Sequence, residues 1–350
     1  MRKLHCAVAA ACRLASAALL RMIGATSLTL ATLLFGQSAA GAQTLSASTQ
    51  GRIEFDSFTP ATMFDLARER RERWERVRVW GELTLPRRPA GRVPAMILMH
   101  GSAGVTPAQR QWVDAFKDLG IATFEVNTFA PRGITDTVAD QGSLNESAHV
   151  MDAFKALEVL AGHPGIDGQR IGIIGFSRGG SAAFRTAIEP LRKAVIKSDL
   201  AFSLHVPVYA GCNQVYWSPK LTGAPLLNLV GEADDYTTAA PCLKLASRYE
   251  AAGSRVRSVA YPDAHHAWDA IIPVTWLPNA SSASSCGVVR WDIEEWRITA
   301  EATGKELNGS ELGKFFSDCS KRGVHVGRNS MAFRASMDDV SRFLKVEFGL

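Results

Sequence analysis

A serine flanked by glycines stands where a short apolar run meets a predicted helix. Residues 171–174 read Ile-Gly-Ile-Ile and lead into Gly175-Phe176-Ser177-Arg178-Gly179, a G-x-S-x-G pattern. Such a run is typical of a strand buried on both faces, and residues 180–187 are typical of a helix. A serine at this sharp turn is held in a strained backbone with its hydroxyl above the sheet, and the glycines avoid collisions that a Cβ would cause. Ser177 is therefore the predicted nucleophile.

Acyl transfer by a serine also needs a base and a carboxylate, and two later strand ends provide candidates. Asp234 and Asp235 follow the predicted strand at 225–230, whereas His265 and His266 follow the last predicted strand. Ligands of parallel α/β sheets bind at the carboxyl ends of the strands. The residues alone leave either aspartate and either histidine open.

Predicted strands and helices alternate through most of the chain. Strands are expected at 50–58, 77–85, 95–99, 121–126, 171–174, 200–208, 225–230 and 256–260, and helices at 107–119, 144–160, 238–252 and 336–348. This alternation predicts an α/β fold, in which a mostly parallel sheet is covered by helices on both faces. The charged stretch 61–75 predicts a solvated helix face.

The first 42 residues are predicted to be a secretory signal peptide. They contain basic but no acidic residues, an apolar segment at 22–35 and small residues ending in Ala40-Gly41-Ala42. The apolar segment is shorter than the about 20 residues that span a bilayer. An uncleaved anchor extending over 7–20 is the alternative, but Arg21 interrupts it. We expect cleavage after Ala42, a periplasmic or secreted protein, and no membrane contact after signal removal.

The net charge changes when the signal is set aside. The chain has 39 basic and 34 acidic residues, and the signal contains four of the basic ones, Arg2, Lys3, Arg13 and Arg21. The remaining chain then carries a net charge of only +1. This balance indicates no nucleic-acid partner. We expect residues 43–350 to form a single domain.

Four cysteines follow the signal, an even number that suits an oxidising compartment. They are Cys212, Cys242, Cys286 and Cys319, and they allow three pairings. Proximity in sequence favours Cys212–Cys242 and Cys286–Cys319, with free buried thiols as the alternative. The second bond would hold an inserted segment around residues 270–328, which interrupts the alternation of strands and helices.

The chain resembles the dienelactone hydrolase branch of the α/β-hydrolase superfamily, from about residue 77 to 268. The resemblance is carried by the motif around Ser177, by Gly231-Glu232-Ala233-Asp234, and by Tyr261-Pro262-Asp263-Ala264-His265-His266-Ala267-Trp268. It implies the α/β-hydrolase fold and a Ser-His-Asp triad. The family's acid stands three residues after a glycine, which selects Asp234, and its histidine stands two before an aromatic residue, which selects His266. The namesake enzyme attacks a cyclic enol-lactone with a cysteine, so a serine here favours general ester hydrolysis.

The resemblance also implies a role for each residue of the site. Ser177 attacks the acyl carbon, His266 acts as base and then acid, and Asp234 orients His266. The backbone N–H groups of Ser102 and Arg178 form the oxyanion hole. We therefore expect a serine carboxylesterase that cleaves a small-molecule ester through an acyl-enzyme, with no cofactor and no metal.

Three further side chains are candidates for substrate binding. The guanidinium groups of Arg132 and Arg178 could bind an acidic group of the substrate, with a structural ion pair or a strand-end cap as the alternative. Trp268 could line a pocket for an acyl or aromatic group, with a place in the core as the alternative.

Three other functions are compatible with these residues. A metal-dependent hydrolase would use Asp263, His265, His266 and Asp269, although adjacent histidines point apart and no H-E-x-x-H helix is present. A peptidase would use the same triad, and a non-catalytic secreted binding module would lack part of it. The sequence carries no signal for an oligomeric state or for a particular ester.

Overall fold

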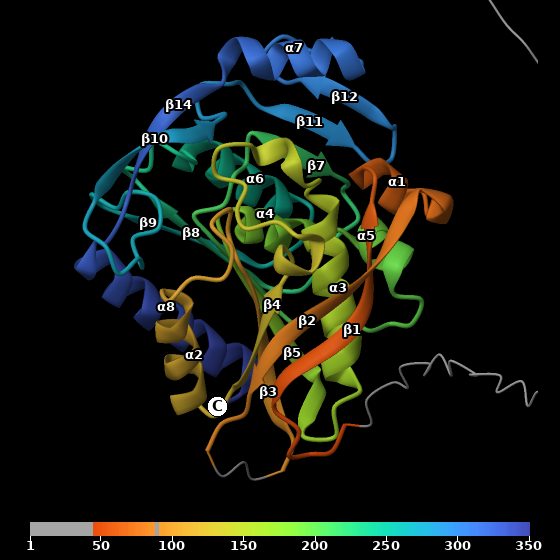
Figure 1. Cartoon of the computed structure of the whole chain (residues 1–350), viewed down its shortest axis with the longest axis vertical. Helices are drawn as coiled ribbons and strands as arrows, with labels where there is room; N and C mark the ends of the chain where they lie inside the picture. The colour runs from red at the N-terminus through yellow and green to blue at the C-terminus, as the bar shows by residue number, and fades with distance from the viewer. Residues whose placement is uncertain (1–44, 88–90) are drawn as a thin grey trace, which may run out of the picture. The chain divides into compact units, whose positions relative to one another are not determined.

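An eight-stranded sheet forms the centre of the structure, a computed structural model that describes residues 45–87 and 91–350 (Figure 1). The strand order is β1-β2-β4-β3-β5-β6-β8-β9. The six strands from β4 to β9 in this order are parallel, while β1 and β2 are antiparallel at one edge. The strands are β1 (Gly51–Pro60), β2 (Trp74–Thr84), β3 (Val93–Met99), β4 (Ala122–Asn127), β5 (Ile166–Phe176), β6 (His205–Val208), β8 (Leu226–Gly231) and β9 (Val256–Tyr261).

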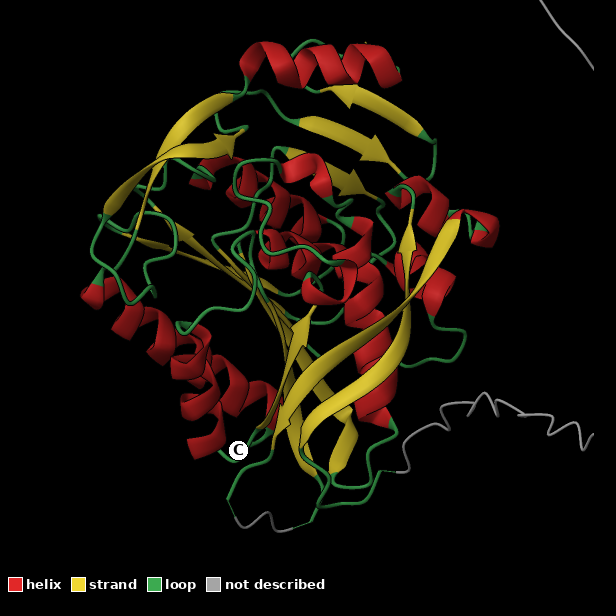
Figure 2. Cartoon of the chain, in the orientation of Figure 1, coloured by secondary structure: helices red, strands yellow, loops and turns green. Residues whose placement is uncertain are grey.

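Helices cover both faces of this sheet (Figure 2). Alternate side chains of β3 point to opposite faces: Ile97 joins the core beneath α3, α4 and α6, and Leu98 joins the core beneath α2 and α8. The α-helices are α1 (Met63–Ala67), α2 (Gln109–Asp118), α3 (Ser147–Ala161), α4 (Arg178–Arg185), α5 (Glu189–Val195), α6 (Ala239–Ala251), α7 (Gly309–Cys319) and α8 (Ser330–Phe348). Three short 3-10 turns are η1 (Arg71–Arg73), η2 (Ala130–Arg132) and η3 (Gln141–Ser143). The predicted α/β class is confirmed.

The inserted segment forms most of two smaller sheets. One pairs β10 with β14, and the other has the order β13-β12-β11-β7, with α7 packed beside it (Figure 1). The strands are β7 (Gln214–Trp217), β10 (Thr275–Ser282), β11 (Val289–Asp292), β12 (Arg297–Ala300), β13 (Lys305–Glu306) and β14 (Lys321–Val326). The disulfide Cys286–Cys319 joins the loop before β11 to the end of α7, and Cys212–Cys242 joins the loop after β6 to α6. Both bonds are the predicted pairings.

The bounds of several predicted elements differ from the structure: β5 begins at Ile166 and α8 at Ser330, each before its predicted start. Within residues 61–75 only α1 is α-helical, because the chain from Trp74 onward pairs with β1, beginning at Pro60. The strand expected at 200–208 begins only at His205. The predicted signal peptide lies outside the described residues. Among the helices that the structure describes, none combines the length and the apolar character that a membrane span requires.

Candidate active site

Ser177 occupies the turn between β5, which ends at Phe176, and α4, which begins at Arg178. Its backbone angles, φ of 54° and ψ of −113°, lie in a region that residues other than glycine rarely adopt. The turn is held because the Ser177 N–H donates to the Val208 carbonyl on the neighbouring strand at 2.9 Å. The hydroxyl is thereby presented at the carboxyl end of the parallel strands.

The glycines of the motif are required by close backbone approach. A Cβ on Gly175 would lie 2.0 Å from the Gly179 carbonyl oxygen, and one on Gly179 would lie 2.1 Å from the Met99 carbonyl oxygen. Neither neighbour is a flexible side-chain end, so the turn excludes any larger residue at both positions. The sequence argument for these glycines agrees with the geometry.

The structure brings Ser177, His266 and Asp234 into one hydrogen-bonded series. His266 Nε2 lies 2.9 Å from Ser177 Oγ, and His266 Nδ1 lies 2.8 Å from Asp234 Oδ2. Asp234 and His266 are each only 4% exposed. With its proton on Nδ1, the imidazole donates to the carboxylate and accepts from the serine hydroxyl, which is the geometry of an activated nucleophile.

The Asp234 carboxylate is fixed by its own loop. Oδ1 accepts from the backbone N–H groups of Tyr236 at 2.9 Å and Thr237 at 2.8 Å. The Thr237 hydroxyl lies 3.0 Å from Asp234 Oδ2 and 3.0 Å from His266 Nδ1. Sequence reasoning missed Thr237, although an aspartate followed two and three residues later by N–H donors is a known turn pattern.

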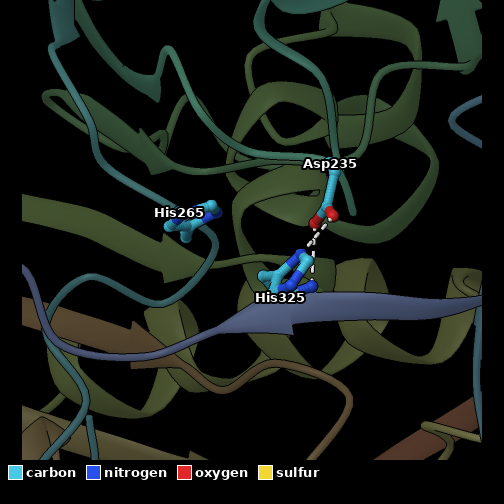
Figure 3. A group of neighbouring side chains, drawn as sticks. All are labelled: Asp235, His265 and His325. Carbon is cyan, nitrogen blue, oxygen red and sulfur yellow. Dashed lines mark hydrogen bonds and ion pairs between the residues drawn. The ribbon is translucent and has the colours of Figure 1, made fainter. Parts of the chain in front are cut away.

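Asp235 and His265, the alternatives to Asp234 and His266, make other contacts. Asp235 accepts from the backbone N–H of His325 at 2.9 Å and is 2.8 Å from the His325 ring, on β14 (Figure 3). The His265 ring lies against His325, with ring centroids 5.3 Å apart. Asp235 and His265 therefore form a separate group, and the hydrogen bonds to Ser177 and within the series are made by Asp234 and His266.

A second loop lies against Ser177, at the end of β3. The position of a Cβ on Gly101 is 3.2 Å from the Ser177 Cβ, so Ser102 is brought beside the serine. His100 supports this loop: its Nε2 accepts from the Thr128 N–H, so Nδ1 carries the proton and donates to the Gly101 carbonyl at 2.8 Å. Burial lowers the pKa of His100 to about 4, which keeps the ring neutral.

Two cavities meet at Ser177. The larger, about 410 Å³, is mainly apolar, with Phe176, Ile271, Leu277 and Val326 among its walls. The smaller, about 110 Å³, is lined largely by polar residues. These include Ser102, Gln141, Glu146, Arg178, Asn213 and Tyr236. Sequence reasoning missed most of these walls, because they come from loops whose course no motif indicates.

The prediction that Arg132 binds substrate is wrong. Its guanidinium donates to both carboxylate oxygens of Asp152 at 2.9 and 3.0 Å, and to Thr59 Oγ1 at 2.8 Å. Asp152 is fully buried, so it needs a cation as partner. Arg132 lines neither cavity at Ser177 and has a structural role.

The prediction that Trp268 lines the pocket is also wrong. Its side chain is 0% exposed, and its Nε1 donates to Ser336 Oγ on α8 at 3.2 Å. The indole packs edge-on against Tyr209, which itself borders the larger cavity. Arg178 lines the smaller cavity, but its guanidinium donates to the backbone carbonyls of Gln141 and Leu144, in keeping with the structural alternative.

The four residues of the metal hypothesis do not form one ligand set. His266 is engaged with Asp234 and Ser177, and Asp269 accepts from the Tyr209 hydroxyl at 2.7 Å and the Trp112 indole at 2.8 Å. Burial raises the pKa of Asp269 although these two bonds oppose the shift. Within residues 45–87 and 91–350, the group with metal-ligand spacing is instead Asp235, His265 and His325.

Comparison with known proteins assigns the chain to a family. The dienelactone hydrolase family profile matches residues 81–273, more than half of the chain. An uncharacterized 31.7 kDa protein of the traX-finO intergenic region of Escherichia coli is 32% identical over 118 residues, which cover 33% of this chain and 40% of that protein. The chain thus matches less than half the length of this relative.

The solved structures to which the chain is similar include the following two. An esterase of Thermogutta terrifontis is 18% identical, with a TM-score of 0.43, over 54% of this chain and 80% of that one. A dienelactone hydrolase-like promiscuous phosphotriesterase from metagenomic libraries is 16% identical, with a TM-score of 0.42, over 62% of this chain and 84% of that one.

The family profile covers β3 to β9, and therefore all three members of the hydrogen-bonded series. The sheet order and the serine turn described above agree with this match. The structure therefore has the α/β-hydrolase fold, and the chain belongs to the dienelactone hydrolase family.

Proposed function

We propose that the protein is a serine carboxylesterase that acts through a triad of Ser177, His266 and Asp234. The observation that carries this proposal is the series of hydrogen bonds from Asp234 through His266 to Ser177, with distances of 2.8 and 2.9 Å. A serine hydroxyl is a weak nucleophile at its ordinary pKa, and an adjacent oriented imidazole activates it.

The reaction would then have two steps, acylation of Ser177 and hydrolysis of the acyl-enzyme. The Ser177 hydroxyl passes its proton to His266 Nε2 as Oγ bonds to the acyl carbon, and the bond to the alcohol oxygen breaks as His266 returns the proton to it. Water repeats the sequence on the acyl-enzyme and releases the acid. The N–H groups of Ser102 and Arg178 would stabilise the oxyanion. The Arg178 N–H belongs to the first turn of α4, whose N–H groups have no acceptor within the helix.

The two cavities suggest the form of the ester. An apolar group of the substrate would occupy the larger cavity, where burying each CH₂ contributes about 0.8 kcal/mol. The smaller polar cavity would accept a short group able to form hydrogen bonds. Esters with one extended apolar part and one small part are therefore the expected substrates.

Hydrolysis of p-nitrophenyl acetate, butyrate and octanoate tests this function. Wild-type protein should prefer the longer chains, and Ser177→Ala should lose about 10⁴-fold or more in kcat because the nucleophile is gone. Ser317→Ala is the matched control, since Ser317 is exposed on α7, far from Ser177 in sequence and outside both cavities. Its activity should equal that of wild type.

Equal activity of Ser177→Ala and wild type would overturn the triad. If wild type cleaves none of the three esters, labelling by a fluorophosphonate decides whether Ser177 is an activated nucleophile. Labelled Ser177 would keep the triad and move the substrate to another class, whereas unlabelled protein would contradict the proposal.

We also propose that the mature protein, residues 43–350, is a single domain in the periplasm or outside the cell. The two disulfides support an oxidising compartment. Sequencing the amino terminus of the exported protein should give Gln43 as its first residue, and a retained Met1 would contradict cleavage.

A further inference from the structure

Two imidazoles and a carboxylate gather beside the proposed triad without belonging to it. The potential ligand atoms of Asp235, His265 and His325 all lie within 4.8 Å of one another (Figure 3). They come from the loop after β8, the loop after β9 and strand β14. We propose that these three side chains form a binding site for a divalent transition-metal ion such as Zn²⁺.

The donor set suits such an ion. Imidazole nitrogen and carboxylate oxygen are zinc ligands, and three protein ligands with an open fourth position are a common arrangement. A tetrahedral ion with bonds of about 2.1 Å holds its ligand atoms about 3.4 Å apart, so side-chain movements of about an ångström would complete the site. Mg²⁺ and Ca²⁺ prefer all-oxygen sites and fit poorly here.

Part of the site is already held in place. Asp235 Oδ1 accepts from the backbone N–H of His325 at 2.9 Å, which orients the carboxylate and leaves Oδ2 beside the His325 ring at 2.8 Å. Trp276 packs against the His325 ring, with the two ring centroids 4.8 Å apart. Outer contacts of this kind orient ligands and raise metal affinity.

His265 provides an independent observation. Its Nδ1 is shielded from solvent and has no hydrogen-bond partner among the described residues. A buried polar atom without a partner costs free energy that a ligand would recover. The carboxylate of Asp235 and the ring of His325 are the polar groups gathered beside it.

The other histidines of the described chain do not compete for a metal ion. His100, His149, His163 and His205 are 0% exposed, and His266 is 4% exposed and bonded to Asp234. The side chains of Asp235 and His325 are each 43% exposed, so an ion can reach them. Binding to the folded protein should therefore be confined to this cluster.

The position of the cluster links it to the proposed triad. Asp235 follows Asp234, His265 precedes His266, and the Gly327 N–H just beyond β14 donates to the His266 carbonyl at 3.0 Å. An ion would connect the loop after β8, which carries Asp234, the loop after β9, which carries His266, and strand β14, which pairs with His266. Bound Zn²⁺ is thus expected to stabilise the fold and to order the His266 loop.

Calorimetric titration of the purified protein, free of any polyhistidine tag, with Zn²⁺ tests the site. We expect the titration to show one ion bound for each chain. Thermal unfolding at saturating Zn²⁺ should show a rise in Tm of about 5 °C. Asp235→Asn, His265→Asn and His325→Ala should each weaken Zn²⁺ binding by more than 10-fold. Asp318→Asn, an exposed carboxylate on α7, is the matched control and should bind Zn²⁺ as wild type does.

The test is independent of ester hydrolysis. Ser177→Ala should retain Zn²⁺ binding whether or not the esterase proposal holds, and the circular dichroism of each variant without metal shows whether it is folded. Absence of binding by wild-type protein at millimolar Zn²⁺ would overturn the site, as would unchanged affinity in folded Asp235→Asn and His325→Ala. In that case the contact between Asp235 and His325 is a hydrogen bond that binds no metal ion.

Discussion

At the scale of single residues, the serine turn depends on backbone contacts that tolerate no side chain. Gly179 approaches the Met99 carbonyl so closely that an added Cβ would lie 2.1 Å away from its oxygen. The strained φ of Ser177 persists only while its neighbours fix it. The site is thus built from small residues as much as from reactive ones.

Gly179→Ala is expected to destabilise the fold by several kcal/mol, since either the helix or β3 must shift. Urea unfolding measures the change. Gly313→Ala is the matched control: Gly313 lies within α7 with no atom within 4 Å of an added Cβ, so stability should rise by about 0.5–1 kcal/mol. A Gly179 variant as stable as wild type would contradict the packing seen here.

Thr237 contacts the acid and the base of the proposed triad. Its hydroxyl is 3.0 Å from Asp234 Oδ2 and from His266 Nδ1, which makes it a positioning residue. Thr237→Val should lower kcat by about 10-fold and change KM less, because the hydroxyl orients the His266 ring while the side chain forms only one part of the wall of the smaller cavity. Steady-state kinetics on the best p-nitrophenyl ester measures both constants.

Two variants separate positioning from mere packing at Thr237. Thr237→Ser keeps the hydroxyl and should restore most of kcat. Thr222→Val is the control, because the Thr222 hydroxyl is buried and has no partner among the described residues, so its loss should leave kcat unchanged. If the Ser and Val variants of Thr237 were equally slow, the hydroxyl would have no positioning role.

At the scale of elements, the inserted segment contributes to the site through the β10–β14 sheet and the residues that flank β10. Val326 at the end of β14 lines the larger cavity and pairs with the backbone of His266. The other end of the segment carries α7, which has no buried residue and is joined to the loop before β11 by Cys286–Cys319. Within the segment, β14 therefore supports the site, whereas α7 lies outside it.

Replacing both Cys286 and Cys319 by serine should therefore loosen α7 while the main sheet stays intact. A disulfide that closes a loop of 33 residues stabilises by about 4 kcal/mol in the chain-entropy account. Hydrogen exchange should accelerate in α7 and β13 and remain slow in β3 and β5. Faster exchange throughout the sheet would mean that the segment is part of the cooperative core.

At the scale of the whole molecule, three buried histidines make the fold sensitive to acid. Burial lowers the pKa of His100 to about 4 and that of His205 to about 3, and it lowers the pKa of His149 well below its ordinary value of 6.5. The unfolded chain therefore binds protons below about pH 6.5 that the folded chain does not. With respect to these three histidines, the free energy of unfolding is highest above about pH 6.5 and decreases as the pH falls toward about 4.

His149→Phe isolates one of these groups. Both ring nitrogens of His149 are buried without a partner in the described structure, so an apolar ring of similar shape loses no hydrogen bond. The variant should lose about 2 kcal/mol less stability than wild type between pH 7 and pH 5. Urea unfolding at the two pH values measures the difference, and equal losses in both proteins would show that His149 does not contribute.

The sequence by itself determined the eight strands of the central sheet, in their order along the chain, and the position of the serine turn. Alternation of short apolar runs with helical stretches is local information, and Gly175-Phe176-Ser177-Arg178-Gly179 joins a run of each kind. Glycines around a serine predict close backbone approach, which the structure contains. Family resemblance selected Asp234 and His266, the pair that the hydrogen bonds to Ser177 also select.

Only the tertiary structure decided which distant side chains meet. Arg132 is engaged by Asp152 on α3, and Trp268 is covered by α8, so neither side chain lines the cavities at Ser177. His325 joins Asp235 and His265 because β14 returns beside the triad loops, a pairing between segments about 60 and 90 residues apart in the chain. Contacts of this range depend on how loops pack, and no local pattern of residues encodes that.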